Sequence, residues 1–423
     1  MDKVHSLNFI DLFAGAGGLS EGFIRAGYTP LAHIEKDKYA CDTLRTRAAF
    51  HYLKNTNRLD IYKKYLYEKQ EKEDGSKLWN QVPNWVTDAV IQSEIGEKTI
   101  ESIFEKVDAL IGGKQVDIII GGPPCQAYSI VGRARVGKTI ENDPRNDLYK
   151  FFIMFLERYK PKMFIFENVP GMLSAKSGTV WGDFRRALVK AEYNIGANVM
   201  DTSKYGVLQI RKRWIIVGRR FLFGNPHVFY PYLEEEENKY QVLNDLFSDL
   251  PERKNGEGQL CVPVAYTKPL SEMAYLEKSG IRNNAFQFTT QHIARPQNAN
   301  DRFIYKLAID KWVNEGIRLS YLDIPTENQT QKNKDSFLNR FRVVAPFGKS
   351  HTVVAHIAMD GHYYIYPKIN PTIENVRSIT VREAARIQSF PDDYYFEGSR
   401  TAAFRQIGNA VPDKINKFKK MAA

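Results

Sequence analysis

The stretch that decides the fold reads Val116-Asp117-Ile118-Ile119-Ile120-Gly121-Gly122-Pro123-Pro124-Cys125-Gln126. Its apolar run from Val116 to Ile120 predicts a buried strand, and the two glycines and two prolines that follow predict a rigid turn. The turn carries a cysteine beside polar Gln126. It follows the carboxyl end of the predicted strand, where parallel α/β sheets place their ligand-binding and catalytic residues. Cys125 is therefore either a nucleophile or an inert thiol that follows a Gly-Pro turn, and the rest of the chain has to decide.

The size and composition of the chain indicate a globular protein. It has 423 residues, of which 43% are hydrophobic, enough for a sizeable core and two or three domains. No stretch approaches a membrane span and the N-terminus lacks the pattern of a signal peptide, so we expect a cytoplasmic protein with no membrane partner. The three cysteines, Cys41, Cys125 and Cys261, lie far apart. Their number and spacing speak against a disulfide framework and against a cysteine zinc site.

The charge of the chain favours a polyanionic partner. Lysine and arginine outnumber aspartate and glutamate by 60 to 49, which gives a formal net charge of +11. A soluble basic enzyme would show the same excess. Three histidines, His351, His356 and His362, lie five and six residues apart without a cysteine nearby. That spacing does not favour zinc, so no metal site is predicted.

A strand, a glycine turn and a helix open the chain. Residues 7–13 (LNFIDLF) predict the strand, residues 14–18 (AGAGG) the turn and residues 19–26 the helix. Backbone N–H groups of such a turn can approach an anionic group closely. The next predicted strand, residues 30–34, ends at Glu35, whose carboxylate could accept hydrogen bonds from both hydroxyls of a ribose. Turn and carboxylate together predict a nucleoside cofactor, with a plain solvated glutamate as the alternative.

Two further strands have charged residues at their ends. Residues 162–166 (KMFIF) predict a buried strand followed by Glu167, which would suit a proton donor if desolvated or could simply cap the next helix. Gln209, Arg211 and Arg213 alternate along the segment that enters the strand 214–218, so we expect them on one face. Two arginines and an amide on one face suit phosphate groups or base edges, with a solvated sheet edge as the alternative.

The pattern of the chain changes after residue 220. Alternating strands and helices give way to polar stretches and short strand-like pieces, so we predict a separate domain over residues 221–375. Residues 1–220 and the C-terminal segment 376–423 would together form the other domain. The predicted fold class is α/β, a doubly wound, mostly parallel sheet with an inserted smaller domain.

Two helical segments complete the prediction. Residues 52–77 have many charge reversals and fit an exposed helical insertion. Residues 380–388 (TVREAARIQ) predict a helix that begins with a capping box of Thr380 and Glu383.

Seven of these segments occur in the order known from one enzyme family. DLFAGAGG, Glu35, GGPPCQAYS, FENVPG, QIRKR, RSITVREAARIQSFPD and QIGNAVP span Asp11 to Pro412 and resemble the motifs of the DNA (cytosine-5) methyltransferases of bacterial restriction–modification systems. The resemblance implies the Rossmann-like methyltransferase fold, S-adenosyl-L-methionine as cofactor, and an inserted target-recognition domain. The cofactor residues that it implies are Phe13, Ala14, Gly15, Gly17, Gly18, Glu35, Pro124, Leu148, Asn409 and Ala410. The family's third motif is poorly matched, and Asp88 and Glu94 compete for the contact with the adenine.

The resemblance also implies a catalytic set and a set of DNA contacts. The catalytic positions are Cys125, Glu167, Arg211 and Arg213. The expected DNA contacts are Gln126, Ser129, Arg133, Gln209, Arg340 and Arg342. In the implied reaction, the target cytosine swings out of the duplex, a thiolate adds to carbon 6, and carbon 5 accepts the methyl group. Glu167 would act at ring nitrogen 3, and Arg213 would bind the ring carbonyl oxygen.

The expected partner is double-stranded DNA, bound by a monomer that protects host DNA in a restriction–modification system, with a cognate restriction endonuclease acting separately. Three alternatives remain: the tRNA-methylating branch that resembles these enzymes, a binding module without chemistry, and a nicotinamide oxidoreductase on the same sheet. The long variable domain favours duplex DNA over RNA. Intact residues at Cys125, Glu167 and Arg213 argue against an inactive module.

Overall fold

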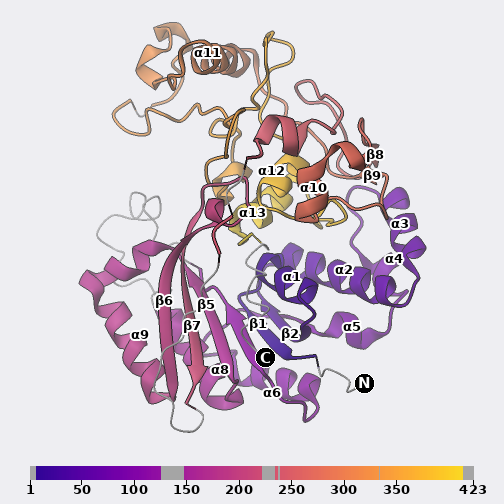
Figure 1. Ribbon diagram of the computed structural model, residues 1–423, viewed down its shortest axis with the longest axis vertical. Helices are drawn as coiled ribbons and strands as arrows, with labels where there is room; N and C mark the ends of the chain where they lie inside the picture. The colour runs from indigo at the N-terminus through magenta and orange to yellow at the C-terminus, as the bar shows by residue number, and fades with distance from the viewer. Residues whose placement is uncertain (1–5, 125–146, 222–233, 237–238, 333, 413–423) are drawn as a thin grey trace.

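A seven-stranded sheet forms the centre of the molecule (Figure 1). The computed structural model describes residues 6–124, 147–221, 234–236, 239–332 and 334–412. The sheet has the order β3-β2-β1-β4-β5-β7-β6. Its strands are β1 (Asn8–Leu12), β2 (Thr29–Glu35), β3 (Val90–Gln92), β4 (Ile118–Gly121), β5 (Met163–Asn168), β6 (Tyr193–Asp201) and β7 (Lys212–Arg220). β1 to β5 pair in parallel and β7 is antiparallel to both of its neighbours. The predicted α/β class with a mostly parallel sheet is confirmed.

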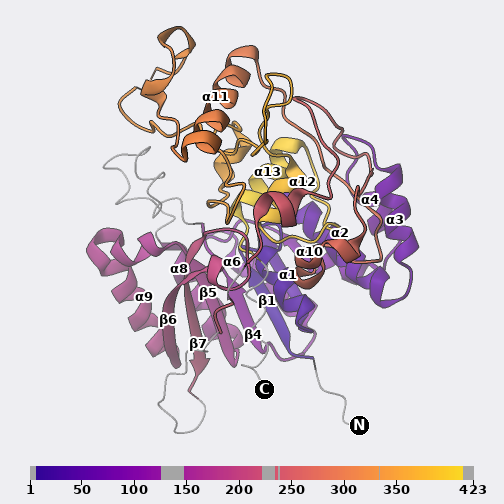
Figure 2. The same ribbon diagram turned by 45° about the horizontal axis from the view of Figure 1, so that its top comes forward.

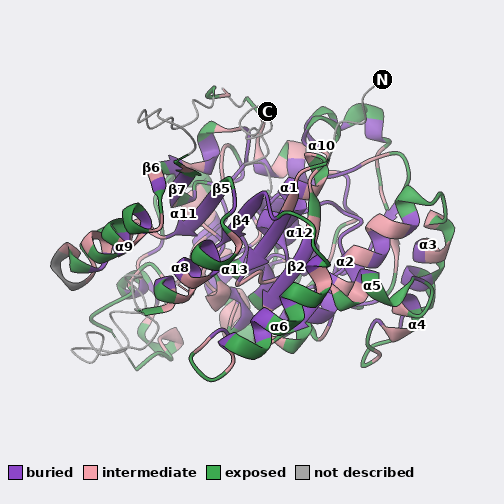
Figure 3. Ribbon diagram, turned by 90° about the horizontal axis from the view of Figure 1, so that it is seen from below, coloured by how far each residue is buried: buried purple, intermediate pink, exposed green. Residues whose placement is uncertain are grey.

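Helices cover both faces of this sheet, because successive strand residues point to opposite sides. Ile119 of β4 packs in the cluster that includes α6 (Ile100–Ile111), α8 (Leu148–Tyr159) and α9 (Thr179–Lys190). Ile118 and Ile120 pack on the other side, with α1 (Gly18–Arg25). Figure 3 shows the buried strands between helices whose outer sides are exposed. The sheet is therefore doubly wound.

The helical insertion is buried on one side, so the prediction that it is exposed is wrong. Its helices and their neighbours are α2 (Lys38–Asn55), α3 (Leu59–Glu68), α4 (Ser76–Trp79) and α5 (Asn84–Asp88). Tyr62 and Leu66 lie in an apolar cluster with Phe286. The ammonium group of Lys69 donates to the carboxylate of Glu397 at 2.9 Å, and both side chains are buried. The insertion packs through aromatic and apolar residues that lie between the charged ones. The prediction of an exposed segment considered only the charged residues.

The last part of the chain forms the second large apolar cluster. Residues 377–411, together with the segment 242–282 that packs on them, are called the C-terminal core. Its helices are α10 (Ala274–Ser279), α12 (Val381–Ile387) and α13 (Arg400–Asn409). Thr380 caps α12 and the Glu383 side chain accepts from the Thr380 N–H, so the predicted capping box is confirmed. Tyr394 donates a hydrogen bond to the carbonyl of Ala16, which ties this core to the glycine turn.

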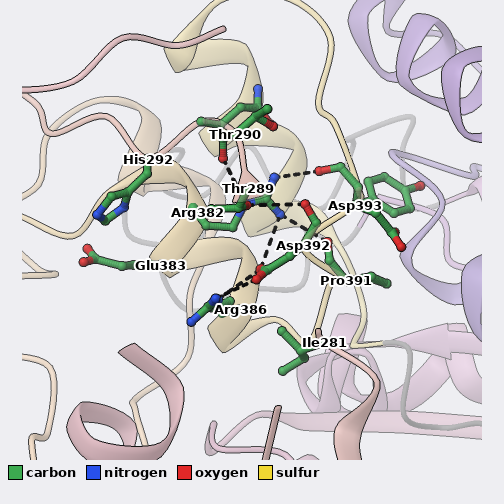
Figure 4. Close-up of polar contacts among 12 residues, drawn as sticks. Ile281, Thr289, Thr290, His292, Arg382, Glu383, Arg386, Pro391, Asp392 and Asp393 are labelled. Carbon is green, nitrogen blue, oxygen red and sulfur yellow. Dashed lines mark hydrogen bonds and ion pairs between the residues drawn. The ribbon is translucent and has the colours of Figure 1, made fainter. Parts of the chain in front are cut away.

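A buried network of charges holds the C-terminal core together (Figure 4). The guanidinium of Arg386 donates to the carboxylates of Asp249 and Asp392. The guanidinium of Arg382 donates to the main-chain carbonyls of Thr290 at 3.0 Å, Pro391 at 3.1 Å and Tyr394 at 2.8 Å. Burying a charge is costly unless it is paired and hydrogen-bonded, and here each charge has such partners.

A smaller lobe projects beyond the C-terminal core. It comprises residues 299–343 and 362–376, contains α11 (Ala299–Glu315), and has an apolar cluster of its own. We call it the outer lobe. Figure 1 and Figure 2 both place α11 at the end of the molecule opposite the sheet. The apolar cluster of the C-terminal core contains residues on both sides of position 375. The structure therefore gives no clear boundary there, and the predicted domain limits stay a prediction.

The remaining described elements are short. They are the strands β8 (Val264–Ala265) and β9 (Phe288–Thr289), one π-helical turn, η5 (Val242–Phe247), and the 3₁₀ turns η3 (Pro170–Gly178), η4 (Thr202–Lys204), η6 (Leu270–Glu272), η7 (Tyr321–Asp323), η8 (Thr326–Asn328) and η9 (Ala355–Ala358). Within the described ranges, no helix combines the length and the apolar character that crossing a membrane requires.

Candidate active site

The glycine turn lies at the carboxyl end of β1. Phe13 leaves the strand with a φ of 56°, a conformation uncommon for a residue with a side chain and frequent at functional sites. Ala14 and Gly15, both partly exposed, follow. The Ala14 N–H donates to the carbonyl of Ile34 at 3.1 Å, and the Gly17 N–H donates back to Ala14 at 2.9 Å. The turn is thus held between β1 and β2 with its backbone partly open.

Glu35 fixes the turn from the end of β2. One carboxylate oxygen accepts from the Gly15 N–H at 2.8 Å, and the other accepts from the N–H groups of Lys36 at 2.9 Å and Asp37 at 2.8 Å. Burial raises the pKa of Glu35, and these backbone donors oppose that shift. A carboxylate has about four lone-pair sites, so some capacity remains for a ligand hydroxyl.

The C-terminal core forms the other wall of the turn. A Cβ atom on Gly18 would lie 2.5 Å from the Val411 carbonyl oxygen and 3.0 Å from the Cβ of Ala410. Glycine is therefore required at this close approach. Asn409 ends α13 beside these residues and is exposed. The predicted cofactor residues at both ends of the chain thus meet at one place, although they are separated by nearly its whole length.

Glu167 and Arg213 form an ion pair at the end of β5. Their closest atoms, Oε1 and Nε, lie 2.7 Å apart, with 11% of the Glu167 side chain and 12% of the Arg213 side chain exposed. The antiparallel register of β5 and β7 explains the contact, since Asn168 is opposite Trp214 and Arg213 precedes it. This pair can reach a ligand while it remains largely shielded from water.

Two residues that the motif reasoning did not single out hold the proline turn against this pair. A Cβ atom on Gly122 would lie 2.6 Å from the Glu167 carboxylate, so only glycine allows the approach. The buried Asn168 amide donates to the Pro123 carbonyl at 3.3 Å and accepts from the Val169 N–H at 2.9 Å. In the sequence, the two glycines before the prolines and the Glu-Asn dipeptide at 167–168 could have indicated this contact.

Several predicted residues lie outside the described part of the chain. These are Cys125, Gln126, Ser129 and Arg133. Pro124, the last described residue before them, is partly exposed. Leu148 is the first residue of α8 and is partly buried. Cys125 is thus attached directly to the turn that Asn168 holds beside Glu167.

The prediction that Gln209, Arg211 and Arg213 share one accessible face is wrong for Gln209 and Arg211, which are both buried. Gln209 has no exposed surface; its amide donates to Ile387 and Gln388, and its oxygen accepts from Val353. That placement leaves no surface for the predicted contact with DNA.

Arg211 is also buried and donates to the carbonyls of Val353 at 2.6 Å and Ala410 at 2.7 Å. The structure anchors Arg211 to the segments of Val353 and Ala410, and the predicted catalytic role of this residue stays a prediction. The segment before β7 turns into the C-terminal core because it pairs with residues 350–353, so only Arg213 reaches the end of β5.

Glu94 and Asp88 lie at opposite ends of β3. Parallel pairing places Gln92 beside Glu35 and Val90 beside His33. Glu94 therefore follows the strand at the same edge as Glu35, and it forms an ion pair with Lys36 at 2.9 Å. Asp88 precedes the strand at the far edge. Of the two open candidates for the cofactor contact, Glu94 is the one near the glycine turn.

Arg340 and Arg342 both lie in the outer lobe. The guanidinium of Arg340 lies over the ring of Tyr321, 4.3 Å from its centroid. The guanidinium of Arg342 donates to the Tyr363 hydroxyl at 3.0 Å. Both side chains are partly exposed. They are accessible to a ligand, in contrast to Gln209.

Similar proteins are known over almost the whole length of this chain. A family model described as C-5 cytosine-specific DNA methylase matches residues 7–71 and 84–418. The type II methyltransferase M.Bpa9945I of Bacillus paralicheniformis is 38% identical over 437 residues, covering 95% of each chain. M1.HphI of Haemophilus parahaemolyticus is 26% identical over 411 residues, covering 96% of this chain and 84% of that protein. A solved prophage-encoded candidate DNA modification methyltransferase from E. coli superposes with a TM-score of 0.59 at 22% identity, covering 98% of this chain and 97% of that one. That likeness supports the fold.

Proposed function

Because this chain belongs to the C-5 cytosine-specific DNA methylase family and is a DNA cytosine methyltransferase, we propose that it acts on a cytosine swung out of duplex DNA, with Cys125 as the nucleophile. The observation that carries the proposal is the Glu167–Arg213 pair, held beside the proline turn that leads to Cys125. A base inside a duplex cannot reach such a site, so the nucleotide has to leave the stack.

The proposed chemistry begins with the thiolate of Cys125. Carbon 5 of cytosine is a poor nucleophile until a thiolate adds to carbon 6 and turns the ring into an enamine. The other two cysteines are poor candidates, since both are buried. Burial raises the pKa of Cys41 to about 12, which keeps that thiol protonated at neutral pH. Free Cys125 would have a pKa of about 8.5, so nearby cations would favour its ionisation.

Glu167 and Arg213 would stabilise the charge that this addition places on the ring. Glu167 donates or transfers a proton at ring nitrogen 3, and Arg213 binds the ring carbonyl oxygen. S-adenosylmethionine, when bound, supplies the methyl group as an electrophilic sulfonium. After methyl transfer the hydrogen on carbon 5 leaves as a proton, the bond between sulfur and carbon 6 breaks, and the thiolate is restored.

The glycine turn is the proposed cofactor site. Its open backbone, the pinned carboxylate of Glu35 and the wall of Ala410 and Val411 suit a nucleoside with a charged tail. Glu94 is the proposed acidic contact for the adenine. Gly18→Ala should abolish cofactor binding measured by calorimetry, because the new Cβ would meet the Val411 oxygen. Gly182→Ala in α9, whose Cβ would meet nothing closer than 3.5 Å, is the matched control.

Base-resolution methylation sequencing of unmethylated plasmid tests the reaction. Incubation with S-adenosylmethionine should give 5-methylcytosine in one short recurrent sequence, and Cys125→Ala should give none. Cys261→Ala, which removes a thiol that contacts the Tyr395 hydroxyl away from Glu167, is the control. Transfer to tRNA with none to DNA would replace DNA by RNA as the substrate. A recurrent site would also fit protection of host DNA against a cognate endonuclease, as the type II names of the relatives suggest.

A further inference from the structure

Tyr394 reaches the glycine turn from the C-terminal core. Its hydroxyl donates to the carbonyl of Ala16, and both residues are buried. Burial raises the pKa of the Tyr394 phenol, so the hydroxyl keeps its proton and acts as a donor. The sequence motifs did not indicate Tyr394, because it follows the last of the matched residues in its segment, Asp392.

This hydrogen bond fixes one peptide plane of the turn from two opposite edges. The carbonyl of Ala16 and the N–H of Gly17 belong to the same planar peptide group and point in opposite directions. The Tyr394 hydroxyl donates to the carbonyl, while the Gly17 N–H donates to the Ala14 carbonyl at 2.9 Å. A rotation of this peptide would break both hydrogen bonds, so the pair holds the backbone direction in the middle of the turn.

The packing around Gly17 is tight on the side of the tyrosine. A Cβ atom on Gly17 would lie 2.8 Å from Cδ2 of Leu44 and 2.9 Å from the hydroxyl oxygen of Tyr394. Gly17 also has a φ of 79°, in the left-handed region that favours glycine. Its carbonyl accepts from the Glu21 N–H at 2.8 Å, at the start of α1. The tyrosine hydroxyl therefore lies against the backbone at the point where the turn enters the helix.

Arg47 on α2 holds both partners of this hydrogen bond. Its guanidinium lies 4.7 Å from the centroid of the Tyr394 ring. It donates to the carboxylate of Glu21 at 2.9 and 2.6 Å, and to the carboxylate of Asp393 at 2.8 Å. The three charged side chains are buried, and each has the paired charge that burial requires. Because Glu21 belongs to α1 and Asp393 precedes Tyr394, Arg47 keeps the turn and the tyrosine at a fixed separation.

The rest of the surroundings leave the tyrosine little conformational freedom. Its ring packs against Phe390 and Phe396, with 4.8 and 5.2 Å between ring centroids. Its main-chain N–H donates to Pro391 at 3.0 Å, and its carbonyl accepts from Arg382 at 2.8 Å. The hydroxyl is thus held in its donating position by contacts within the protein.

Glu35 and Tyr394 hold consecutive residues of the same turn. The Glu35 carboxylate accepts from the Gly15 N–H at 2.8 Å, and Tyr394 donates to the next residue, Ala16. A loop that has to be ordered by its ligand loses part of the binding free energy to that ordering. A turn fixed from both sides before the ligand arrives avoids this loss.

We propose that Tyr394 is a positioning residue for the cofactor: its hydroxyl fixes the orientation of the Ala16–Gly17 peptide and so raises the affinity of the glycine turn for S-adenosylmethionine. This inference rests on the proposed cofactor site. Tyr394 contacts the turn and not the reacting atoms, so it acts on cofactor binding and leaves the rate of the chemical step unchanged.

Tyr394→Phe tests the proposal, because it removes the hydroxyl and keeps the ring. In calorimetry of the full chain with S-adenosylmethionine alone, the Kd should rise about tenfold, the effect of one hydrogen bond lost at a buried carbonyl. In methyl transfer to duplex DNA, the KM for S-adenosylmethionine should rise by a similar factor, while kcat at saturating cofactor stays within about twofold of the parent value.

Tyr62→Phe is the matched control. Tyr62 is buried, and its hydroxyl donates to the carbonyl of Asp393 at 2.8 Å, one residue before Tyr394. The control thus removes the same kind of hydrogen bond from the same segment and leaves the bond to Ala16 intact. It should lower the melting temperature about as much as Tyr394→Phe does, and it should leave the Kd for S-adenosylmethionine unchanged.

Hydrogen exchange without cofactor gives a second measurement. Mass spectrometry of peptides that cover residues 13–19 should show faster amide exchange in Tyr394→Phe than in Tyr62→Phe, because the Gly17 N–H is no longer held in a fixed plane. Equal exchange in the two variants would contradict the proposal.

Three further results would overturn the proposal. The first is a Tyr394→Phe variant that binds S-adenosylmethionine as tightly as the parent. The second is an equal loss of affinity in Tyr62→Phe, which would mean general loosening of the segment. The third is a lower kcat with an unchanged KM, which would mean an effect on the chemical step. A parent protein that binds no S-adenosylmethionine would instead refute the proposed cofactor site.

Discussion

In the C-terminal core, the guanidinium of Arg386 is fully buried and bound by two carboxylates, whereas in the outer lobe Arg318 is exposed over Trp312. In the first arrangement, the charge of Arg386 is neutralised by carboxylates of the protein itself, so the arginine holds chain segments together. In the second, no carboxylate within the described ranges pairs with the guanidinium, so its charge is available to a partner outside the protein. The Glu167–Arg213 pair lies between these extremes, since it is paired and shielded but still partly exposed. The way an arginine is neutralised thus distinguishes the buried scaffold, the proposed catalytic pair and the exposed surface of the outer lobe.

The sharpest test of that comparison is Glu167→Gln. The amide keeps the shape of the side chain but removes the acid, so methyl transfer should fall by about a thousandfold while the fold persists. Single-turnover transfer of a labelled methyl group measures the chemical step, and thermal melting measures the fold. A variant that melts as the parent does but transfers as fast would remove Glu167 from the catalytic set.

Arg386→Met tests the scaffold end of the comparison. Removing one partner leaves the carboxylates of Asp249 and Asp392 buried without a cation, and the free energy of unfolding should fall by about 3–5 kcal/mol. Urea unfolding followed by circular dichroism measures it. Arg186→Met, whose partner Asp183 is exposed, is the matched control and should change little. Equal effects of the two variants would mean that burial of the pair is not what matters.

A neutral histidine that contacts the N-cap residue of α12 predicts acid sensitivity. His292 contacts Thr380 and the Pro251 carbonyl, and burial lowers its pKa to about 4. The unfolded chain, with a histidine pKa of about 6.5, binds the proton more tightly, so stability falls as the pH drops from about 6.5 towards 4. This histidine should contribute a loss of about 2 kcal/mol between pH 7 and pH 5. Urea unfolding at both pH values of the parent and of His292→Phe measures it, and an equal loss in both proteins would contradict the assignment.

The smallest effect on stability is expected at the exposed arginine of the outer lobe. Arg318→Ala should change the free energy of unfolding by no more than about 0.5 kcal/mol, because this side chain is exposed and pairs with no carboxylate in the described part of the chain. The same urea titration measures it. A loss as large as that of Arg386→Met would break the comparison, because it would give Arg318 a role in the scaffold.

The sheet was predictable because its strands are apolar runs that end in glycine, proline or charged residues. The ends of β1, β2, β4 and β5 agreed within two residues with the predicted strands. β6 has exposed side chains at its centre and lacks such an apolar run. The predicted capping box depends only on residues three positions apart in the sequence, which is why the hydrogen bonds of Thr380 and Glu383 could be predicted.

The inward direction of Gln209 and Arg211 was not predictable. Alternation along an extended segment places them with Arg213, but that rule assumes a strand, and the strand begins only at Lys212. The hydrogen bonds from Arg211 to Val353 and Ala410 depend on residues far away in the sequence. The pairing of Lys69 with Glu397 was hidden for the same reason.

The contact between Gly18 and Val411 determines when during synthesis the glycine turn can be completed. Protein synthesis proceeds from the N-terminus, so the glycine turn leaves the ribosome long before the residues that close it. A chain terminated early lacks Val411, and with it the wall against which Gly18 packs. If the glycine turn binds the cofactor as proposed, methyl transfer begins only after the outer lobe, which lies between these residues in the sequence, has also been made. Incomplete products would not mark DNA, because the proposed cofactor site lacks one wall until Val411 has been made.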